Sequence, residues 1–236
     1  MSRFVTKIDF RKIKINMAET ISNSAGKKSS ANIFTNTYLP WILIASVNIL
    51  MAFLLSTQGR LWWCKWDTPL YFATLDAWSK HTSQHFFDPY ALTHILHGFL
   101  FFWILDILFC KILNKKISFA WILLLAVLTE SAWEVLENSS YVIERYREQT
   151  ASLDYFGDTI ANSFGDVLAC IAGVFIAYKL KFRRTLVLFI LVEIILILTI
   201  KDSLIINIIM LIYPLESLKQ WQIGGRETAL LLSRLF

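Results

Sequence analysis

Long apolar stretches separated by short charged segments follow one another from residue 38 onward. A helix of about 20 apolar residues is long enough to cross the hydrocarbon core of a bilayer. We therefore predict membrane spans at about 38–56, 90–110, 119–138, 158–178 and 186–200. The pattern predicts an all-α fold, a polytopic transmembrane helix bundle with about five spans.

The segments around these spans predict the remaining organisation. Residues 1–37 are polar and basic and are expected to form a flexible cytoplasmic leader, ahead of a single membrane domain over residues 38–236. Met17 is a candidate for the true start. Residues 205–213 are apolar but too short to cross about 30 Å of hydrocarbon. They predict an interfacial or re-entrant segment, followed by an amphipathic tail on the surface, with a tilted sixth span as the alternative.

Composition and charge support a membrane protein. Of the 236 residues, 56% are hydrophobic and only 17% are charged, whereas soluble domains contain about 25% charged residues. The net charge of +5 comes from basic residues that flank apolar runs, which indicates a lipid bilayer rather than nucleic acid as the partner. The leader and the segments 111–116 and 179–184 hold 14 of the 23 lysines and arginines. Because cytoplasmic loops are enriched in these residues, the N-terminus is predicted to be cytoplasmic.

Acidic and histidine side chains interrupt three of the predicted spans, and within each span their spacing places them on one helix face. They are His94 and His97 in the second span, Glu130, Glu134 and Glu137 in the third, and Asp158, Asn162 and Asp166 in the fourth. An ionisable residue at mid-bilayer costs about 2.5–3.5 kcal/mol on insertion scales, so such residues are normally paired and functional. We expect the three polar faces to meet in the outer half of the membrane.

Small residues beside the acidic stripe of the fourth span indicate how the helices approach one another. Gly165, Ala169, Gly173 and Ala177 recur every four residues. Small residues at this spacing allow two helix backbones to pack closely.

The residue types favour metal chemistry. His94 and His97 are the candidate metal ligands, and Glu130, Glu134, Glu137, Asp158 and Asp166 are the candidate ligands or catalytic carboxylates. Such a set suits a divalent transition metal, namely zinc, manganese or iron. A remaining carboxylate could activate water against a phosphoester, ester or amide. Arg145, Arg147 and Asn162 are the candidate substrate-binding residues, because arginine binds phosphate and carboxylate groups through paired hydrogen bonds.

Several motifs resemble those of a known family. They are Trp78-Ser79-Lys80-His81-Thr82-Ser83-Gln84-His85, Asp88-Pro89-Tyr90, Thr93-His94-Ile95-Leu96-His97-Gly98, Glu130-Ser131-Ala132-Trp133-Glu134, Glu137-Asn138-Ser139, Arg145-Tyr146-Arg147, Gly157-Asp158, Asn162-Ser163 and Gly165-Asp166. Over roughly residues 60–225 the chain resembles a small family of uncharacterised bacterial inner-membrane proteins with a domain of unknown function. More distantly, it is similar to VanZ-like membrane proteins linked to glycopeptide resistance. These resemblances imply a multi-pass protein of the bacterial inner membrane and imply no activity.

Three functions remain open at this point. The polar residues could perform metal-assisted chemistry on an envelope lipid or glycolipid, could relay protons or cations in a transporter, or could hold together an assembly or resistance factor without chemistry. The H-E-x-x-H zinc motif is absent from the sequence, and H-x-x-H alone is a weak signal. His81 and His85 lie four apart in a predicted loop, as additional ligands or as interfacial hydrogen-bonding groups. Cys64 is predicted in a loop, and Cys110 and Cys170 in helices; all three are interpreted as small apolar residues.

Overall fold

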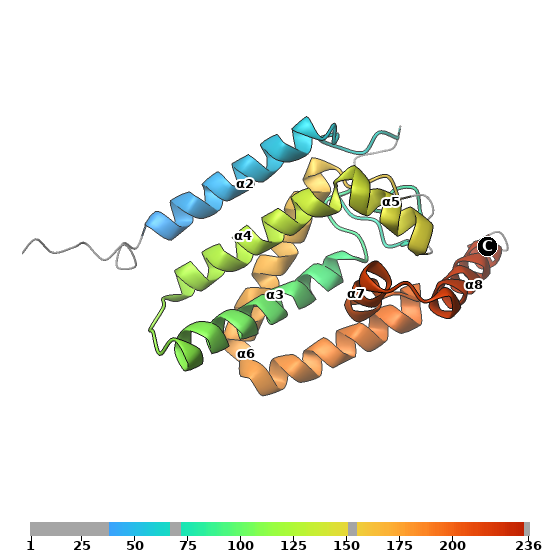
Figure 1. The fold of residues 1–236 in the computed structure, drawn as a ribbon. Coiled ribbons are helices and arrows are strands. Elements are labelled where there is room, and N and C mark those ends of the chain that lie inside the picture. The colour runs from blue at the N-terminus through green and yellow to red at the C-terminus, as the bar shows by residue number, and fades with distance from the viewer. Residues whose placement is uncertain (1–37, 67–71, 151–154, 234–236) are drawn as a thin grey trace, which may run out of the picture. The chain divides into compact units, whose positions relative to one another are not determined.

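The computed structural model describes residues 38–66, 72–150 and 155–233, so the predicted leader lies outside the described residues. The helices are α2 (Leu39–Thr57), α3 (Ala91–Asp106), its π-helical continuation η2 (Ile107–Ile112), α4 (Phe119–Glu137), α5 (Ser140–Gln149), α6 (Ile160–Ile200), α7 (Leu204–Ile212) and α8 (Glu216–Ser233) (Figure 1). In these ranges the β-structure is limited to an isolated bridge between Ala73 and Phe87. The prediction of an all-α fold is confirmed.

Among the described residues, three helical segments are long and apolar enough to cross a membrane. They are α2, the continuous stretch Ala91–Ile112 that joins α3 to η2, and α4. They coincide with the first three predicted spans to within a few residues. The other two predicted spans both fall within α6, and their crossing of a membrane stays a prediction.

Helix α6 differs from the two separate helices that the sequence predicts for this region. The helix runs from Ile160 to Ile200 and is interrupted at Lys181 alone, which has φ 62° and ψ 167° (Figure 1). The charged run at 179–184 indicated a loop, because it interrupts the apolar pattern. The chain instead changes direction at Lys181 alone, and the residues of the charged run on both sides of it are helical. The parts of α6 before and after Lys181 are its first and second arms.

Helix α5 occupies the charged segment that follows the third predicted span. The side chain of Ser139 accepts a hydrogen bond from the backbone N–H of Val142 at 3.4 Å and caps the helix. Val142, Ile143 and Tyr146 are buried on one side of it. The helical period was present in the sequence, but the charged residues between these positions obscured it.

Helix α7 is the short apolar segment that the sequence predicts between the last span and the tail. Its nine residues extend over about 14 Å, half the thickness of the hydrocarbon. The buried carboxylate of Glu193 accepts hydrogen bonds from the backbone N–H groups of Leu204 at 3.0 Å and Ile205 at 3.3 Å. A carboxylate at a helix N-terminus satisfies free N–H groups and complements the helix dipole. Glu193 therefore anchors α7 on the second arm of α6.

Helices α3 and α6 touch along their backbones. A Cβ atom added to Gly98 would collide with backbone atoms of Cys170, Gly173 and Val174, and one added to Gly173 would collide with the backbone of Ile95. Gly173, one of the small residues that recur every four positions, thus lies where the two helices cross, which confirms the close approach predicted for this face of the helix.

A larger side chain at Gly173 should separate α3 from α6. We expect Gly173→Leu to lower the free energy of unfolding by about 3 kcal/mol, because rigid backbone atoms would have to move. Thermal unfolding of the detergent-purified protein, followed by tryptophan fluorescence, measures the change. The matched control is Gly224→Leu, because a Cβ atom at Gly224 meets nothing within 4 Å. Equal stability of the two variants would contradict this packing.

Asp202 connects the end of α6 to α3 from a buried position. Its Oδ1 accepts a hydrogen bond from the N–H of Ser203 at 2.9 Å, and its Oδ2 accepts one from the hydroxyl of Tyr90 at 3.2 Å. Burial raises the pKa of Asp202 to about 7, although both hydrogen bonds favour the charged form. The folded protein therefore retains this proton over a pH range in which the unfolded chain, with an ordinary Asp pKa of about 3.9, loses it.

The stability of the fold should decrease as the pH rises from about 4 through 7, because the folded state binds more protons than the unfolded state in this window. The wild type should lose ~2 kcal/mol of unfolding free energy between about pH 5 and pH 8 through Asp202, or roughly 6 °C in unfolding temperature, and Asp202→Asn should not show this loss. The measurement is thermal unfolding at both pH values, with the exposed Glu144→Gln as control. An unchanged pH dependence in Asp202→Asn would contradict the assignment.

Candidate functional site

A cavity of about 910 Å³ lies beside α3 and is bounded by several other elements. Its wall includes residues of α4, α5 and α7, the first turns of α6, and the segments 77–90 and 155–158. Six of the ten site residues predicted from the sequence line it, and these are His94, His97, Glu137, Asp158, Asn162 and Asp166. The cavity is large enough for a small organic ligand or a lipid headgroup.

Glu130 lies behind the two histidines and contacts both of them. Its Oε1 is 2.5 Å from Nδ1 of His94, and its Oε2 is 3.0 Å from Nδ1 of His97. Glu130 is fully buried, and the histidines form the layer between it and the cavity. This is the arrangement of a carboxylate that orients imidazoles whose other nitrogens face a ligand. The expected meeting of the polar faces of α3 and α4 therefore occurs.

Glu134 is also fully buried, one helical turn further along α4. Its Oε1 is 3.6 Å from Nδ1 of His94, and within the described residues neither carboxylate oxygen has a hydrogen-bond partner. Asp166 of α6 reaches the same imidazole from the other side, with Oδ2 at 3.9 Å from Nε2, and its Oδ1 likewise has no partner there. A buried acceptor without a partner costs about 1–3 kcal/mol, and such atoms indicate a bound water or ion.

Two overlapping groups of side chains have metal-ligand spacing. The donor atoms of His94, His97 and Glu130 lie within 4.8 Å of one another, and so do those of His94, Glu134 and Glu137. His94 belongs to both groups. The predicted ligands and carboxylates from α3 and α4 thus form one cluster that contains both nitrogen and oxygen donors.

Asp158 and Asn162 line the same cavity but are engaged in hydrogen bonds. Oδ2 of Asp158 accepts hydrogen bonds from Nδ2 of Asn138 at 2.8 Å and from the hydroxyl of Tyr155 at 3.0 Å. Burial raises the pKa of Tyr155 well above its ordinary value, so this phenol is a neutral donor. Nδ2 of Asn162 donates to the carbonyl of His85 at 2.9 Å. Both predicted site residues therefore hold the walls of the cavity in place.

The two arginines predicted to bind substrate lie elsewhere. The guanidinium of Arg145 donates to the carbonyl of Leu211 at 2.5 Å and to that of Ile212 at 3.2 Å, at the C-terminal end of α7. The guanidinium of Arg147 lies 5.3 Å from the ring centre of Phe156. Neither arginine belongs to the cavity wall in the described part of the chain. Their substrate-binding role stays a prediction, and the geometry gives both a structural role.

Lysines and apolar side chains complete the wall, and sequence reasoning missed them. Lys65 and Lys80 line the cavity, and the ammonium groups of both lie within 5.0 Å of the ring centre of Trp66. The apolar part of the wall includes Leu100, Phe101, Ala132, Trp133, Leu136, Leu204, Ile208 and Leu211. Their helical periodicity was visible in the sequence, but nothing in it indicated that these faces surround a cavity. The cavity wall therefore contains both charged and apolar side chains.

The likeness to known proteins covers most of the chain. The model of a family described as "Protein of unknown function (DUF2585)" matches residues 55–224. A UPF0314 protein of Brucella anthropi is 37% identical over 187 residues, 78% of this chain and 90% of that protein. A UPF0314 protein of Sinorhizobium fredii is 42% identical over 188 residues, 78% of this chain and 92% of that protein.

A third relative, a UPF0314 protein of Rhizobium etli, is 46% identical over 143 residues, which are 61% of this chain and 70% of that protein. No solved structure matches the chain. The family match begins near the end of α2 and ends within α8, so it includes every residue of the histidine and carboxylate cluster. The chain belongs to this family of proteins of unknown function.

Proposed function

We propose that this protein is a polytopic enzyme of the bacterial inner membrane that uses a divalent transition metal to act on a polar group of an envelope lipid or glycolipid. The observation that carries the proposal is the buried carboxylate of Glu134. It lies 3.6 Å from His94, and neither of its oxygens has a hydrogen-bond partner among the described residues. A cation bound at this point would provide a partner for the two carboxylate oxygens and would compensate their negative charge.

The donor set supports a transition metal. Imidazole nitrogens and carboxylate oxygens together suit zinc, manganese or iron, whereas calcium and magnesium prefer oxygen alone. His94, Glu134 and Glu137 would hold the ion, and Glu130 would orient the imidazole of His94 from behind. Such an ion lowers the pKa of a bound water and polarises carbonyl or phosphoryl oxygens. Asp166, on the opposite side of His94, is the carboxylate best placed to accept a proton from water in the cavity.

The shape and chemistry of the cavity support an amphipathic substrate. Aromatic side chains cover the approach to the cluster, since the ring of His97 stacks on Phe101 at 5.7 Å and meets Trp133 edge-on at 6.3 Å. Lys65 and Lys80 provide positive charge on the cavity wall. A lipid could place its apolar part against the aromatic wall and its anionic group between the lysines and the cluster.

The exposed apolar surface supports five membrane spans, with both arms of α6 included. Large hydrophobic side chains are exposed along the whole of α6, among them Leu168, Phe175, Val187, Ile190, Leu191, Ile194, Ile195 and Leu198. Water would disfavour such a surface, whereas lipid would cover it. The basic run at 179–184 lies at the turn of α6, which suits a cytoplasmic position for the turn and for the N-terminus.

A proton or cation relay is the second candidate, and the row of acidic residues along one face of α4 favours it. Donor atoms of Glu134 and Glu137 lie within 4.8 Å of each other and of His94, so a proton could move between them. The third candidate is an assembly or resistance factor, as the likeness to VanZ-like proteins suggests. Neither candidate requires a tightly bound metal, and this difference separates them from the enzyme.

Elemental analysis of the detergent-purified protein tests the metal. We expect His94→Ala/His97→Ala to lose about one equivalent of a transition metal relative to the wild type, because His94 belongs to both candidate donor groups and His97 to one of them. The double variant must still elute as a monodisperse species. The control is Glu144→Gln, which removes an exposed acid and should retain the metal. Equal metal content in the double variant and the wild type would refute the site.

Substitution of Glu134 separates a metal ligand from a structural carboxylate. Without metal, Glu134→Gln should be more stable than the wild type, because a buried carboxylate without partners becomes neutral. Its metal affinity should fall at least ~10-fold. Unfolding with and without added zinc or manganese measures both effects.

Release of headgroups from a bacterial lipid extract, followed by mass spectrometry, should be lost in Glu134→Gln and retained in Glu144→Gln. Folded wild-type protein that neither binds metal nor releases headgroups would favour the relay or the assembly factor.

A further inference from the structure

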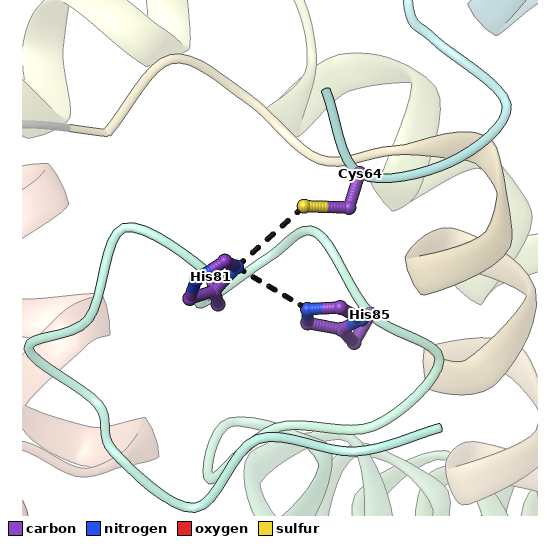
Figure 2. Close-up of side chains that lie close together, drawn as sticks. All are labelled: Cys64, His81 and His85. Carbon is purple, nitrogen blue, oxygen red and sulfur yellow. Dashed lines mark hydrogen bonds between the residues drawn. The ribbon is translucent and has the colours of Figure 1, made fainter. Parts of the chain in front are cut away.

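A second cluster of nitrogen and sulfur donors lies outside the buried site, in the segments that precede α3. The Nδ1 atom of His81 is 3.6 Å from the Sγ atom of Cys64 and 3.4 Å from the Nε2 atom of His85 (Figure 2). All three donor atoms lie within 4.8 Å of one another. The side chains come from two loop segments and point toward a common centre, as Figure 2 shows.

These distances fit a metal ion better than hydrogen bonds. Hydrogen bonds between nitrogen atoms are usually close to 3.0 Å, and one ring nitrogen carries at most one hydrogen for its two neighbours. Zinc binds nitrogen at about 2.0–2.1 Å and sulfur at about 2.3 Å with tetrahedral angles, so donors on one ion are about 3.4 Å apart for two nitrogens and about 3.6 Å for nitrogen and sulfur. Both separations at His81 match these values.

The backbone holds the two segments in place independently of the three side chains. The N–H of Ile160 donates to the carbonyl of Leu61 at 2.8 Å, and the N–H of Thr159 donates to that of Ser83 at 2.9 Å. The start of α6 therefore binds both the segment with Cys64 and the segment with the two histidines. The donor cluster is preformed by this anchoring.

The turn between the histidines is built to bring them together. Ser83, midway between His81 and His85, has a φ of 62°, which reverses the chain. Its N–H donates to Oδ2 of the buried Asp88 at 2.7 Å, which stabilises this conformation. His85 is itself 1% exposed and meets the ring of Trp63 edge-on. The local structure thus fixes both imidazoles before any ligand arrives.

We propose that Cys64, His81 and His85 form a binding site for a zinc-class divalent ion, separate from the histidine and carboxylate cluster of α3 and α4. One thiolate and two imidazoles form a softer donor set than the buried cluster and select against magnesium and calcium. Three protein ligands leave a fourth position open for water, a partner or an exchangeable ligand, unlike a closed structural zinc site.

The site also lies next to the wall of the large cavity. Lys65 and Trp66 follow Cys64, Lys80 precedes His81, and all three of these neighbours line the cavity. Nε1 of Trp66 donates to the carbonyl of Lys80 at 3.1 Å. A metal ion at the cluster joins the two segments that carry the cationic part of the wall.

Cobalt provides a readout that is specific for the thiolate. We expect Co²⁺ added to the reduced, detergent-purified full chain to give the near-ultraviolet absorption of sulfur-to-cobalt charge transfer at one equivalent, and Zn²⁺ to displace it. Cys64→Ser should abolish the absorption, and His81→Ala should weaken cobalt binding at least ~10-fold. Cys110→Ser is the matched control and should behave as the wild type, because Cys110 lies in η2 on an exposed surface.

His94→Ala/His97→Ala should keep the cobalt absorption, so the failure of one site is distinguishable from the failure of the other. No absorption in the wild type, or full absorption in Cys64→Ser, would overturn the proposal.

A second measurement avoids substitution at the site. Zn²⁺ should slow alkylation of Cys64 by a maleimide at least ~10-fold and leave Cys110 unaffected, as measured by peptide mass spectrometry. Equal protection of the two cysteines would also contradict the site.

Discussion

The direct backbone contact between α3 and α6 is the constraint on which the candidate site depends. Gly98 and Gly173 leave no side chain between the two helices. His94 lies one turn before Gly98, and Asp166 lies two turns before Gly173, so both face the same crossing. The resulting 3.9 Å between His94 and Asp166 is a consequence of this packing. Larger residues at the crossing would move a wall of the cavity away from the cluster.

The buried negative charges around His94 are not balanced by positive charges of the chain, so helix packing alone does not complete the site. The imidazole of His94 lies among Glu130, Glu134 and Asp166, so one ring is surrounded by three buried carboxylates. Even with His97, which also contacts Glu130, two imidazolium groups carry too little charge to balance three carboxylates, and burial of an unbalanced carboxylate is costly. The cluster needs protons or a cation from outside the chain. A membrane enzyme with a metal ion and a proton relay are two solutions to the same imbalance.

Much of the helical fold and the centre of the candidate site could be predicted from the sequence. Span positions follow from apolar length, so α2, α3 and α4 begin and end close to where they were predicted. The meeting of His94 with Glu130 follows from helical periodicity, because lipid would not tolerate either polar face. These predictions depend on local patterns that a helix converts directly into geometry.

The parts that could not be predicted depend on how irregular segments run in space. The cations of the cavity wall are Lys65 and Lys80 rather than the expected Arg145 and Arg147, because the loops before α3 fold against the start of α6. No periodicity specifies such a path. In the same way, the meeting of Cys64 with His81 results from tertiary hydrogen bonds, so the sequence alone favoured the interpretation of a small apolar residue.

The turn of α6 has an architectural consequence. Lys181 adopts a backbone conformation that is favourable for glycine and costs other residues about 1–3 kcal/mol. Since this one residue is the whole connection, the two arms share a fixed rotational phase. One inserted residue would turn the second arm by about 100° about its axis and carry Glu193 away from the first turn of α7. Insertions should therefore be tolerated more easily in the other loops of this protein than at this corner, because the corner sets the rotation of the second arm relative to the first.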